Sequence, residues 1–414
     1  MEWKHYKMDE LIEEISMGPF GSDVKKEFYV DNGVPILNGS NLQGFKLQED
    51  SFGYLTKEKA DSLKKCNAHR GDIIVTHRGT LGQIVYVPVN SKYDRYVISQ
   101  SQFRFRCKAD LVDVQYLVYY FHTREGQYKI LANASQVGVP ALARATSTFR
   151  LIDIKLPPLD DQRRIASILS SLDRKIELNY KINADLEVMA QAIFKNWFVD
   201  FEPFKDGKFV DSELGMIPEG WKVGRLDEIA DVVGGSTPSK AKPEYYTQKG
   251  IAWLTPKDLS NHPAVYTSRG EIDITEEGYN STSTKLMPKG TILFTSRAPI
   301  GYISIAQNDI CTNQGFKSLV PKKAGTCFLY CFLKYVTPEI ENKSTGSTFK
   351  EASGALMKSL QVLMPEQKVF EDFETIVSPL FARIESLEKE NSRLSLLRDT
   401  LLPRLMSGEL EVPE

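Results

Sequence analysis

The chain repeats itself, and this repeat limits the folds that it can adopt. Residues 2–11 read EWKHYKMDEL and residues 220–229 read GWKVGRLDEI, so a Trp-Lys pair and an Asp-Glu pair return with the same spacing. Further along, GDIIVTHRGTLGQIVYV at 71–87 matches GTILFTSRAPIGYISIA at 290–306. Matching blocks in the same order indicate two copies of one unit rather than two unrelated domains.

Each copy begins with a mixed part that contains strands and short helices. GDIIVT and GQIVYV are β-rich and flank the turn HRGT, so they predict two strands joined by a short connection. The stretch VISQSQFRFRC at 97–107 alternates Phe with Arg, which predicts a half-buried strand. DVQYLVYYFHT at 113–123 predicts a short buried helix.

Each copy then ends in a long helix. No Pro or Gly occurs from Gln162 to Trp197, and apolar residues recur at heptad spacing there and again near the end of the chain. Sustained heptads predict a coiled coil, in which a polar Asn in the seam sets the register. The residues that we assign to the helix seam are Leu172, Asn179, Leu186, Leu380, Leu387 and Leu394. A second stripe along the two helices includes Met189, Ile376 and Leu397, with Asn391 in its gap.

The sequence therefore predicts an α+β fold built from two similar globular domains, each followed by a long helix. Because similar units can pack about a pseudo-two-fold axis, we expect the two helices to form an antiparallel coiled coil. The expected parts are a first domain at 1–157, a central helix at 158–198, a connector at 199–219, a second domain at 220–365, and a C-terminal helix and tail at 366–414.

The composition argues against several classes of protein. No run of about 18 apolar residues occurs, so we expect no membrane span. The amino terminus is polar and lacks a signal-peptide core, which predicts a cytoplasmic protein. Five cysteines do not indicate a disulfide framework. The net charge of −2 permits contact with DNA without demanding it.

Motifs of catalysis are missing from the sequence. It contains no GxxxxGK[ST] phosphate loop, no HExxH zinc motif, and no Asn-Pro-Pro or Asp-Pro-Pro followed by an aromatic residue. Glu202, Asp206 and Lys208 resemble half of a metal-dependent nuclease signature, but a polar turn after the helix explains them better. We therefore expect no catalytic residue and no metal site in this chain.

Four phrases of the sequence carry a resemblance to a known family. LPPLDDQRRIASILSSLDRKIE, WFVDFEPF, MIPEGW and LLPRLMSGEL resemble the specificity subunits of type I restriction-modification systems, and the resemblance spans essentially the whole chain. It implies that the two domains are target-recognition domains and that the helices are spacers. It also implies that each domain binds one half of a bipartite, asymmetric site in double-stranded DNA.

The resemblance further implies partners that carry out the chemistry. Two methyltransferase subunits would use S-adenosylmethionine to methylate adenine N6, and restriction subunits would cut unmodified DNA. S-adenosylmethionine, Mg²⁺ and ATP are then expected on those partner subunits, with no cofactor bound by this chain, which would not itself be an enzyme.

Two equivalent turns are the best candidates for DNA contact, because both copies carry Thr-x-Arg between two expected strands. Arginine can bind guanine O6 and N7 bidentately or hold phosphate, and Gln or Asn can read adenine. The alternatives are a surface arginine without a role, amides that bond strand edges, and a solvated strand face for Arg104. The candidates are Asn38, Ser40, Asn41, Thr76, His77, Arg78, Gln100, Gln102, Arg104, Lys257, Thr295, Ser296, Arg297, Asn313, Gln314, Lys317, Thr348 and Lys350.

A different class of function remains open from the residues alone. Two globular domains joined by a coiled coil can also serve as an interaction scaffold that does not bind DNA, and the net charge near zero agrees with that alternative. A nuclease is a third alternative, which would require metal-dependent cleavage by the isolated chain.

Overall fold

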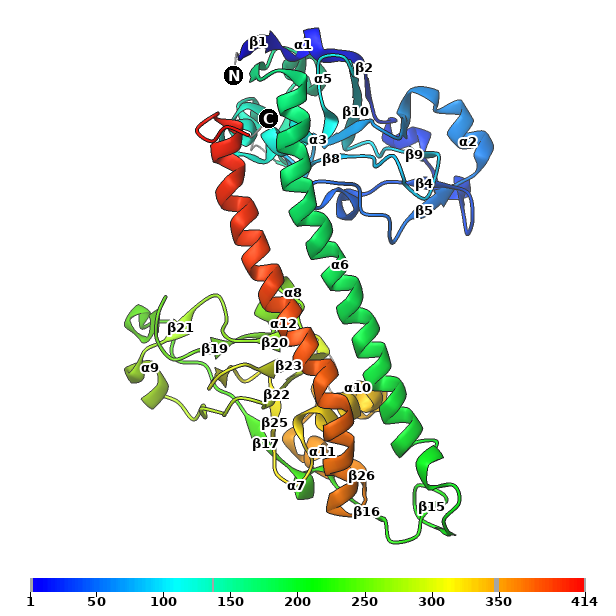
Figure 1. Ribbon diagram of the computed structural model, residues 1–414, viewed down its shortest axis with the longest axis vertical. Coiled ribbons are helices and arrows are strands. Elements are labelled where there is room, and N and C mark those ends of the chain that lie inside the picture. Colours follow the sequence, from blue (N-terminus) through cyan, green and yellow to red (C-terminus); the bar gives the residue numbers. More distant parts are fainter. Residues whose placement is uncertain (1–2, 136–137, 346–349, 413–414) are drawn as a thin grey trace. The chain divides into compact units, whose positions relative to one another are not determined.

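The computed structural model describes residues 3–135, 138–345 and 350–412, and the chain divides into two compact units. Unit 1 comprises Met1–Lys175 and Arg393–Glu414, and unit 2 comprises Ile176–Ser392. Two helices of 40 residues, α6 (Leu159–Phe198) and α12 (Gln367–Met406), each contribute to both units. The expected α+β class, with a long helix after each of two similar domains, is confirmed (Figure 1).

Unit 1 contains two small sheets whose apolar faces are both covered. A four-stranded antiparallel sheet has the order β2-β10-β7-β8, with the bounds Ile12–Met17, Gln102–Cys107, Ile73–Thr76 and Ile84–Tyr86. A five-stranded sheet has the order β3-β5-β4-β9-β6, with the bounds Tyr29–Val30, Gly53–Leu55, Val34–Ile36, Arg95–Val97 and Asn67–His69. Phe103 and Phe105 face the core under α3 (Val114–His122), whereas Ile74 and Val85 face the core of the five-stranded sheet.

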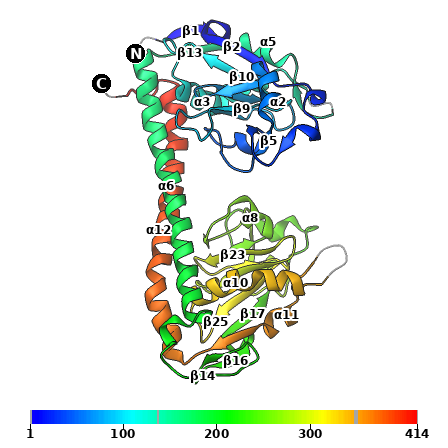
Figure 2. The ribbon, with the colours of Figure 1, turned by 90° about the vertical axis from the view of Figure 1, so that its right-hand side faces the viewer.

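Unit 2 repeats the central sheet of unit 1 and extends it by one strand. Its sheet has the order β17-β25-β22-β23-β20, with the bounds Ala230–Gly234, Lys317–Pro321, Ile292–Ser296, Ile300–Ala306 and Tyr266–Thr267. The first four strands correspond in order to β2-β10-β7-β8. Helix α10 (Thr326–Lys343) packs on β22, β23 and β25, and Figure 2 shows it beside β23 and β25. The repeat in the sequence is therefore a repeat of topology.

The opening motif recurs because the same short structure opens both domains. Strand β1 (Lys4–Lys7) pairs with β13 (Asp153–Leu156), and β16 (Lys222–Arg225) pairs in the same way with β26 (Gln361–Met364). A one-turn helix follows each strand, α1 (Met8–Leu11) or α7 (Leu226–Ile229), and its apolar residues are fully buried. The recurrent glutamate accepts the backbone N–H three residues before it, at 2.7 Å for Glu10 and 2.8 Å for Glu228.

The two long helices run antiparallel where they meet within each unit. In unit 1 the beginning of α6 and the end of α12 share one core, which contains Ile165, Leu169, Leu402 and Leu405. In unit 2 the end of α6 packs on the beginning of α12 through Phe198 and Phe373, whose ring centroids lie 5.2 Å apart. The amide of Asn179 donates to the Asn391 side-chain oxygen at 2.8 Å, so the two asparagines pair across the helices.

The residues that we assigned to the helix seam differ in how deeply they are buried. Leu387 is fully buried, Leu186 and Leu380 pack against the unit 2 core, and Leu172 and Leu394 are half-buried. The second stripe is wrong at Met189, Ile376 and Leu397, which are about half exposed. The reason is that each helix also packs on a globular domain, so the buried positions of α12 follow that face. These buried positions are Phe370, Phe373, Val377, Phe381 and Ile384. In the part of the chain that the structure describes, no helix is both long enough and apolar enough to cross a membrane.

Candidate nucleic-acid interface

The first Thr-x-Arg turn joins β7 to β8, and hydrogen bonds to the rest of the domain fix its conformation. The Thr76 hydroxyl is buried and donates to Gln83 Oε1 at 3.0 Å. His77 is half-buried, its Nε2 lies 3.2 Å from the Gln100 carbonyl oxygen, and burial lowers the pKa of its imidazole. Arg78 is exposed. Thr76 and His77 therefore fix the turn, and Arg78 is accessible at the surface.

The second turn follows β22 and is also fixed by a buried threonine, although the hydrogen-bond partners differ. The Thr295 hydroxyl donates to the Pro299 carbonyl at 2.9 Å and accepts the Tyr302 N–H at 2.9 Å. The Ser296 hydroxyl donates to the Gly315 carbonyl at 3.1 Å. Arg297 follows these buried residues and keeps about a third of its side chain exposed. Threonine and serine therefore support the turn, and the arginine is the residue that can reach a ligand.

Each turn is also paired with a segment that lies much later in its domain. In unit 1 Arg78 faces Ala141 in an antiparallel bridge, and the Leu142 N–H donates to the His77 carbonyl at 2.8 Å. In unit 2 Arg297 faces Glu351 in the same kind of bridge, and the Ala352 N–H donates to the Ser296 carbonyl at 2.9 Å. The two turns are equivalent in this contact as well.

Three loops meet beside the first turn. Ser40 donates to Asn38 Oδ1 through its N–H at 2.8 Å, and the Gln83 amide donates to the Gly39 carbonyl at 3.1 Å. Gln102 is buried and bridges the same loops, because its amide donates to the Asn38 carbonyl at 3.3 Å and its oxygen accepts the Ser99 N–H at 2.9 Å. We call the exposed residues gathered here, Asn38, Ser40, Arg78 and Gln100, the first turn surface.

The second turn has corresponding neighbours with different side chains. Gln314 is exposed and accepts a hydrogen bond from the Thr237 hydroxyl, and Asn313 Oδ1 accepts the Gly315 N–H at 2.8 Å. A Cβ on Gly315 would lie 2.8 Å from Pro256 Cγ, so the helix α8 (Pro256–Asn261), which carries the exposed Lys257, approaches this loop closely. We call the accessible residues here, Lys257, Arg297, Asn313, Gln314 and Lys317, the second turn surface.

Two further candidates lie in the segment after α10. Lys350 is exposed, and its Nζ donates to the Glu341 carbonyl at 3.3 Å. Thr348 lies outside the described residues.

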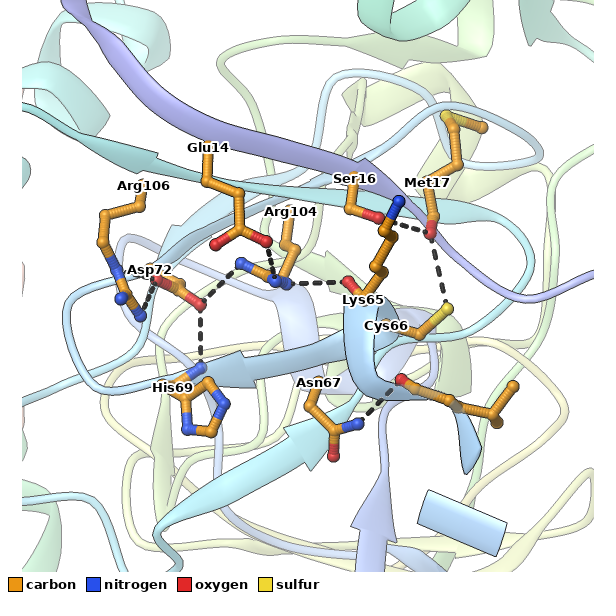
Figure 3. A network of polar contacts seen from close by, with 11 residues as sticks. Glu14, Ser16, Met17, Lys65, Cys66, Asn67, His69, Asp72, Arg104 and Arg106 are labelled. Atoms are coloured by element: carbon orange, nitrogen blue, oxygen red, sulfur yellow. Dashed lines mark hydrogen bonds and ion pairs between the residues drawn. The ribbon is translucent and has the colours of Figure 1, made fainter. Parts of the chain in front are cut away.

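Arg104 does not belong to an open strand face, so both readings of it, phosphate-facing or solvated, are wrong. Its side chain is 4% exposed and contacts Glu14 at 2.6 Å and Asp72 at 3.3 Å, while its Nε donates to the Lys65 carbonyl at 3.0 Å (Figure 3). Arg106 binds the other oxygen of Asp72, at 2.7 Å. The physical reason is that the second sheet covers this face of β10, so Arg104 must be paired inside the domain.

Five other candidates are buried and already bonded within their domains. Asn41 is one example, because its amide donates to the carbonyls of Gln48 and Asp50 at 3.2 and 2.8 Å. Direct contact with a base is not open to these side chains, and their bonds hold the loops that carry the exposed candidates. They are Asn41, Thr76, Gln102, Thr295 and Ser296.

Sequence reasoning missed two residues of these surfaces. Gln83 ties the first turn to the loop at residues 38–42, and Glu351 contacts both Arg297 and Lys317. A weak signal existed for Gln83, since it directly follows the recurrent Gly82. None existed for Glu351, because its position depends on a backbone pairing between residues more than fifty positions apart.

Comparisons with known proteins identify a family model that matches both copies of the repeat. The family model described as "Type I restriction modification DNA specificity domain" matches residues 1–188 and 218–395. The type I restriction enzyme MjaIX specificity subunit of Methanocaldococcus jannaschii is 40% identical over 190 residues, which cover 45% of this chain and 44% of that protein. The HindI specificity subunit of Haemophilus influenzae is 24% identical, and that alignment covers 99% of this chain and 100% of the relative.

A solved structure shows a similar fold. It is the S subunit of a type I restriction-modification system from M. genitalium, which is 19% identical and superposes with a TM-score of 0.59. The match covers 98% of this chain and 96% of that one. At this identity the likeness concerns the fold alone.

Proposed function

The chain belongs to the type I restriction-modification DNA specificity family, and from this membership we propose that it is the specificity subunit of such a complex. Each recognition domain binds one half of a bipartite, asymmetric site in double-stranded DNA. The family match covers both copies of the repeat, which favours this function over a scaffold that does not bind DNA.

One observation carries the proposal at the level of residues. Two equivalent turns, at the ends of equivalent strands, present Arg78 and Arg297 beside exposed amides. Arginine and amide side chains are the residues that recognise guanine and adenine in the major groove. The neighbours differ, with Asn38 and Gln100 at the first turn and Lys257 and Gln314 at the second. Different neighbours give two different half-sites, so the whole site is asymmetric.

The chemistry is assigned to partner subunits. S-adenosylmethionine, Mg²⁺ and ATP bind to two methyltransferase subunits and to the restriction subunits, and this chain is neither a methyltransferase nor a nuclease. The missing phosphate-loop and methyltransferase motifs support that division of labour. The complex then works in the cytoplasm, where its DNA is.

The long helix offers a surface on which a methyltransferase subunit can dock. Within unit 2, Leu178, Val188 and Met189 of α6 are 52%, 67% and 51% exposed. Exposed apolar side chains along a helix are available for a contact with another protein. The exposed apolar residues of α6 therefore support recruitment of a partner subunit by the helices rather than by the turn surfaces.

A methylome comparison tests the proposal. Methyltransferase subunits would be expressed in one host with and without this chain, and methylated adenines would be mapped by sequencing. We expect a bipartite motif of two different parts that appears only when this chain is present. A motif that does not depend on this chain would refute the function. DNA binding by the chain with its methyltransferase partner should also weaken steeply with salt, whereas a scaffold would show no binding.

A further inference from the structure

Glu351 lies beside the two cationic residues Arg297 and Lys317 of the second turn surface. Its carboxylate lies 3.5 Å from Arg297 Nη1 through one oxygen and 3.5 Å from Lys317 Nζ through the other. A backbone bridge to Arg297 fixes its position, and its N–H donates to the Thr345 carbonyl at 2.9 Å. One carboxylate therefore contacts both cations at this turn and offsets one of their two positive charges.

The equivalent position of the first domain carries no charge. Ala141 forms the same bridge to Arg78 that Glu351 forms to Arg297, and the residues that follow, Leu142 and Ala352, make equivalent hydrogen bonds to the turns. Arg78 has no ion pair with any residue that the structure describes. The two domains thus share one backbone arrangement and differ in whether an acid faces the arginine.

The contacts of Glu351 are of the kind that another anion can displace. The side chains of Arg297, Glu351 and Lys317 are 36%, 39% and 17% exposed, and both distances are long for charge-assisted bonds. An exposed ion pair such as Arg297–Glu351 contributes little to stability. A DNA phosphate or a guanine edge must nevertheless replace the carboxylate before Arg297 and Lys317 can bind DNA, and it must then lie near a negative charge.

This difference leads to an inference that rests on the proposed function. We propose that Glu351 is a specificity-determining residue of the second domain, because its carboxylate beside Arg297 and Lys317 repels a charged DNA phosphate more than the neutral base edge of the correct half-site. DNA that offers only its backbone gains less there than it would without the acid. The first domain lacks this competition, so Arg78 contributes to binding of DNA with any sequence.

Two reciprocal substitutions test the inference. Glu351→Gln removes the competing charge from the second domain, and Ala141→Glu introduces one into the first. Glu277→Gln, at an exposed position of the short helix α9 (Glu276–Asn280), controls for the change in net charge. Ala141→Gln controls for the size of the new side chain.

The measurement is the affinity of the chain, bound to its methyltransferase subunits, for four labelled duplexes. One carries the full site found by methylome sequencing, two have one half scrambled, and one has both halves scrambled. Glu351→Gln should tighten binding to the duplex with a scrambled second half by about three- to tenfold, and change binding to the full site less. Ala141→Glu should weaken binding to the duplex with a scrambled first half by a similar factor.

The salt dependence gives an independent measurement. If Arg297 and Lys317 are released to bind phosphate, Glu351→Gln should steepen the slope of log K against log salt by about one to two on the scrambled duplex.

Three results would overturn the inference. If both substitutions behave as Glu277→Gln and Ala141→Gln do, Glu351 does not compete with DNA. If Glu351→Gln changes the preference at a single base pair only, Glu351 reads a base such as cytosine instead. If the unaltered complex binds the site no more tightly than scrambled DNA, the proposed function fails, and the inference fails with it.

Discussion

Arg78 and Arg297 stand at the same place in two copies of one sheet, yet each has its own surroundings. The sequence predicted the pair because both copies keep Thr-x-Arg at a strand end. It could not separate the arginine from the threonine, since both are polar and their burial depends on loops far away in the chain. Thr76 and Thr295 are buried within the turns, whereas the arginines reach the surface.

Substitution of each turn arginine tests base contact against phosphate contact. Arg78→Ala should weaken binding at one half-site and Arg297→Ala at the other. A bidentate base contact predicts a loss of about 1–3 kcal/mol that is confined to one half. A phosphate contact predicts a loss on every sequence and a salt slope flatter by about one.

Binding measured on duplexes with either half scrambled separates these two outcomes. Arg124→Ala, at another exposed arginine of unit 1, serves as the control. If neither turn variant differs from this control, neither turn arginine contacts DNA.

Arg104 should matter for stability rather than for DNA binding. Arg104→Ala leaves Asp72 and Glu14 without this partner, and loss of one member of a buried ion pair typically costs about 3–5 kcal/mol. Chemical denaturation should show a lower free energy of unfolding than for Arg124→Ala. If the variant is as stable as the control but binds DNA weakly, Arg104 belongs to the interface after all.

At the scale of elements, the two long helices have to pack on each other and on a globular domain at once. A strict heptad cannot serve both contacts, because a straight helix drifts relative to a repeat of seven. Asn179 and Asn391 pair across the two helices, as polar residues in a seam should. Met189 and Ile376 are about half exposed, because the helices turn other positions towards the globular domains. Periodicity predicts the helices and their pairing but not the choice of buried face.

Leucine-to-alanine substitutions rank the seam positions. Leu387 is fully buried, so Leu387→Ala should lower the free energy of unfolding by about 2–5 kcal/mol. Leu172 is half-buried, and Leu172→Ala should cost less. Denaturant titrations of both variants, with the exposed Lys181→Ala as control, measure the difference. Equal effects, or a larger one at Leu172, would contradict the seam as the structure has it.

Glu388 should make stability depend on pH. Its carboxylate on α12 accepts the N–H groups of Val265 and Tyr266 at 2.7 and 3.0 Å, beside a cavity of about 310 Å³. The pKa of Glu388 is raised from 4.5 to about 7, chiefly by burial and to a smaller extent by the charges of Glu187 and Glu385, against the lowering effect of the two N–H groups. The folded chain therefore binds this proton more tightly than the unfolded chain does.

Linkage then fixes the sign of the effect. The stabilisation from protonated Glu388 is fully present below about pH 4.5 and is lost as the pH rises towards 7. The loss is on the order of 3 kcal/mol at about 1.4 kcal/mol per pKa unit. Glu388→Gln should flatten the unfolding free energy between pH 5 and 8, whereas the exposed Glu371→Gln should not. A parallel pH profile for Glu388→Gln and the unaltered chain would contradict this assignment.

At the scale of the whole molecule, the chain begins twice because each domain opens with the same strand, short helix and glutamate cap. This local structure is encoded by neighbouring residues, so the repeat and the fold class could be predicted from the sequence. The five-stranded sheet of unit 1 could not, because its strands of two to three residues carry no readable period. The burial of Arg104 could not be predicted for the same reason, because this five-stranded sheet covers one face of β10.

The final prediction concerns the two continuous helices of 40 residues. In a bipartite site both half-sites must meet their domains at a fixed separation along the duplex, and we expect the helices to set that separation. One heptad would be inserted after Lys175 and another after Ser392, where each helix passes from one unit to the other, so that contacts within each unit are retained.

Seven residues lengthen a helix by about 10 Å, or roughly three base pairs at about 3.4 Å each. The methylated motif should keep both specific parts and gain a gap longer by about three base pairs. A heptad in only one helix should break the pairing and abolish methylation. A methylome in which the gap stays unchanged after both insertions would show that the helices do not set the separation.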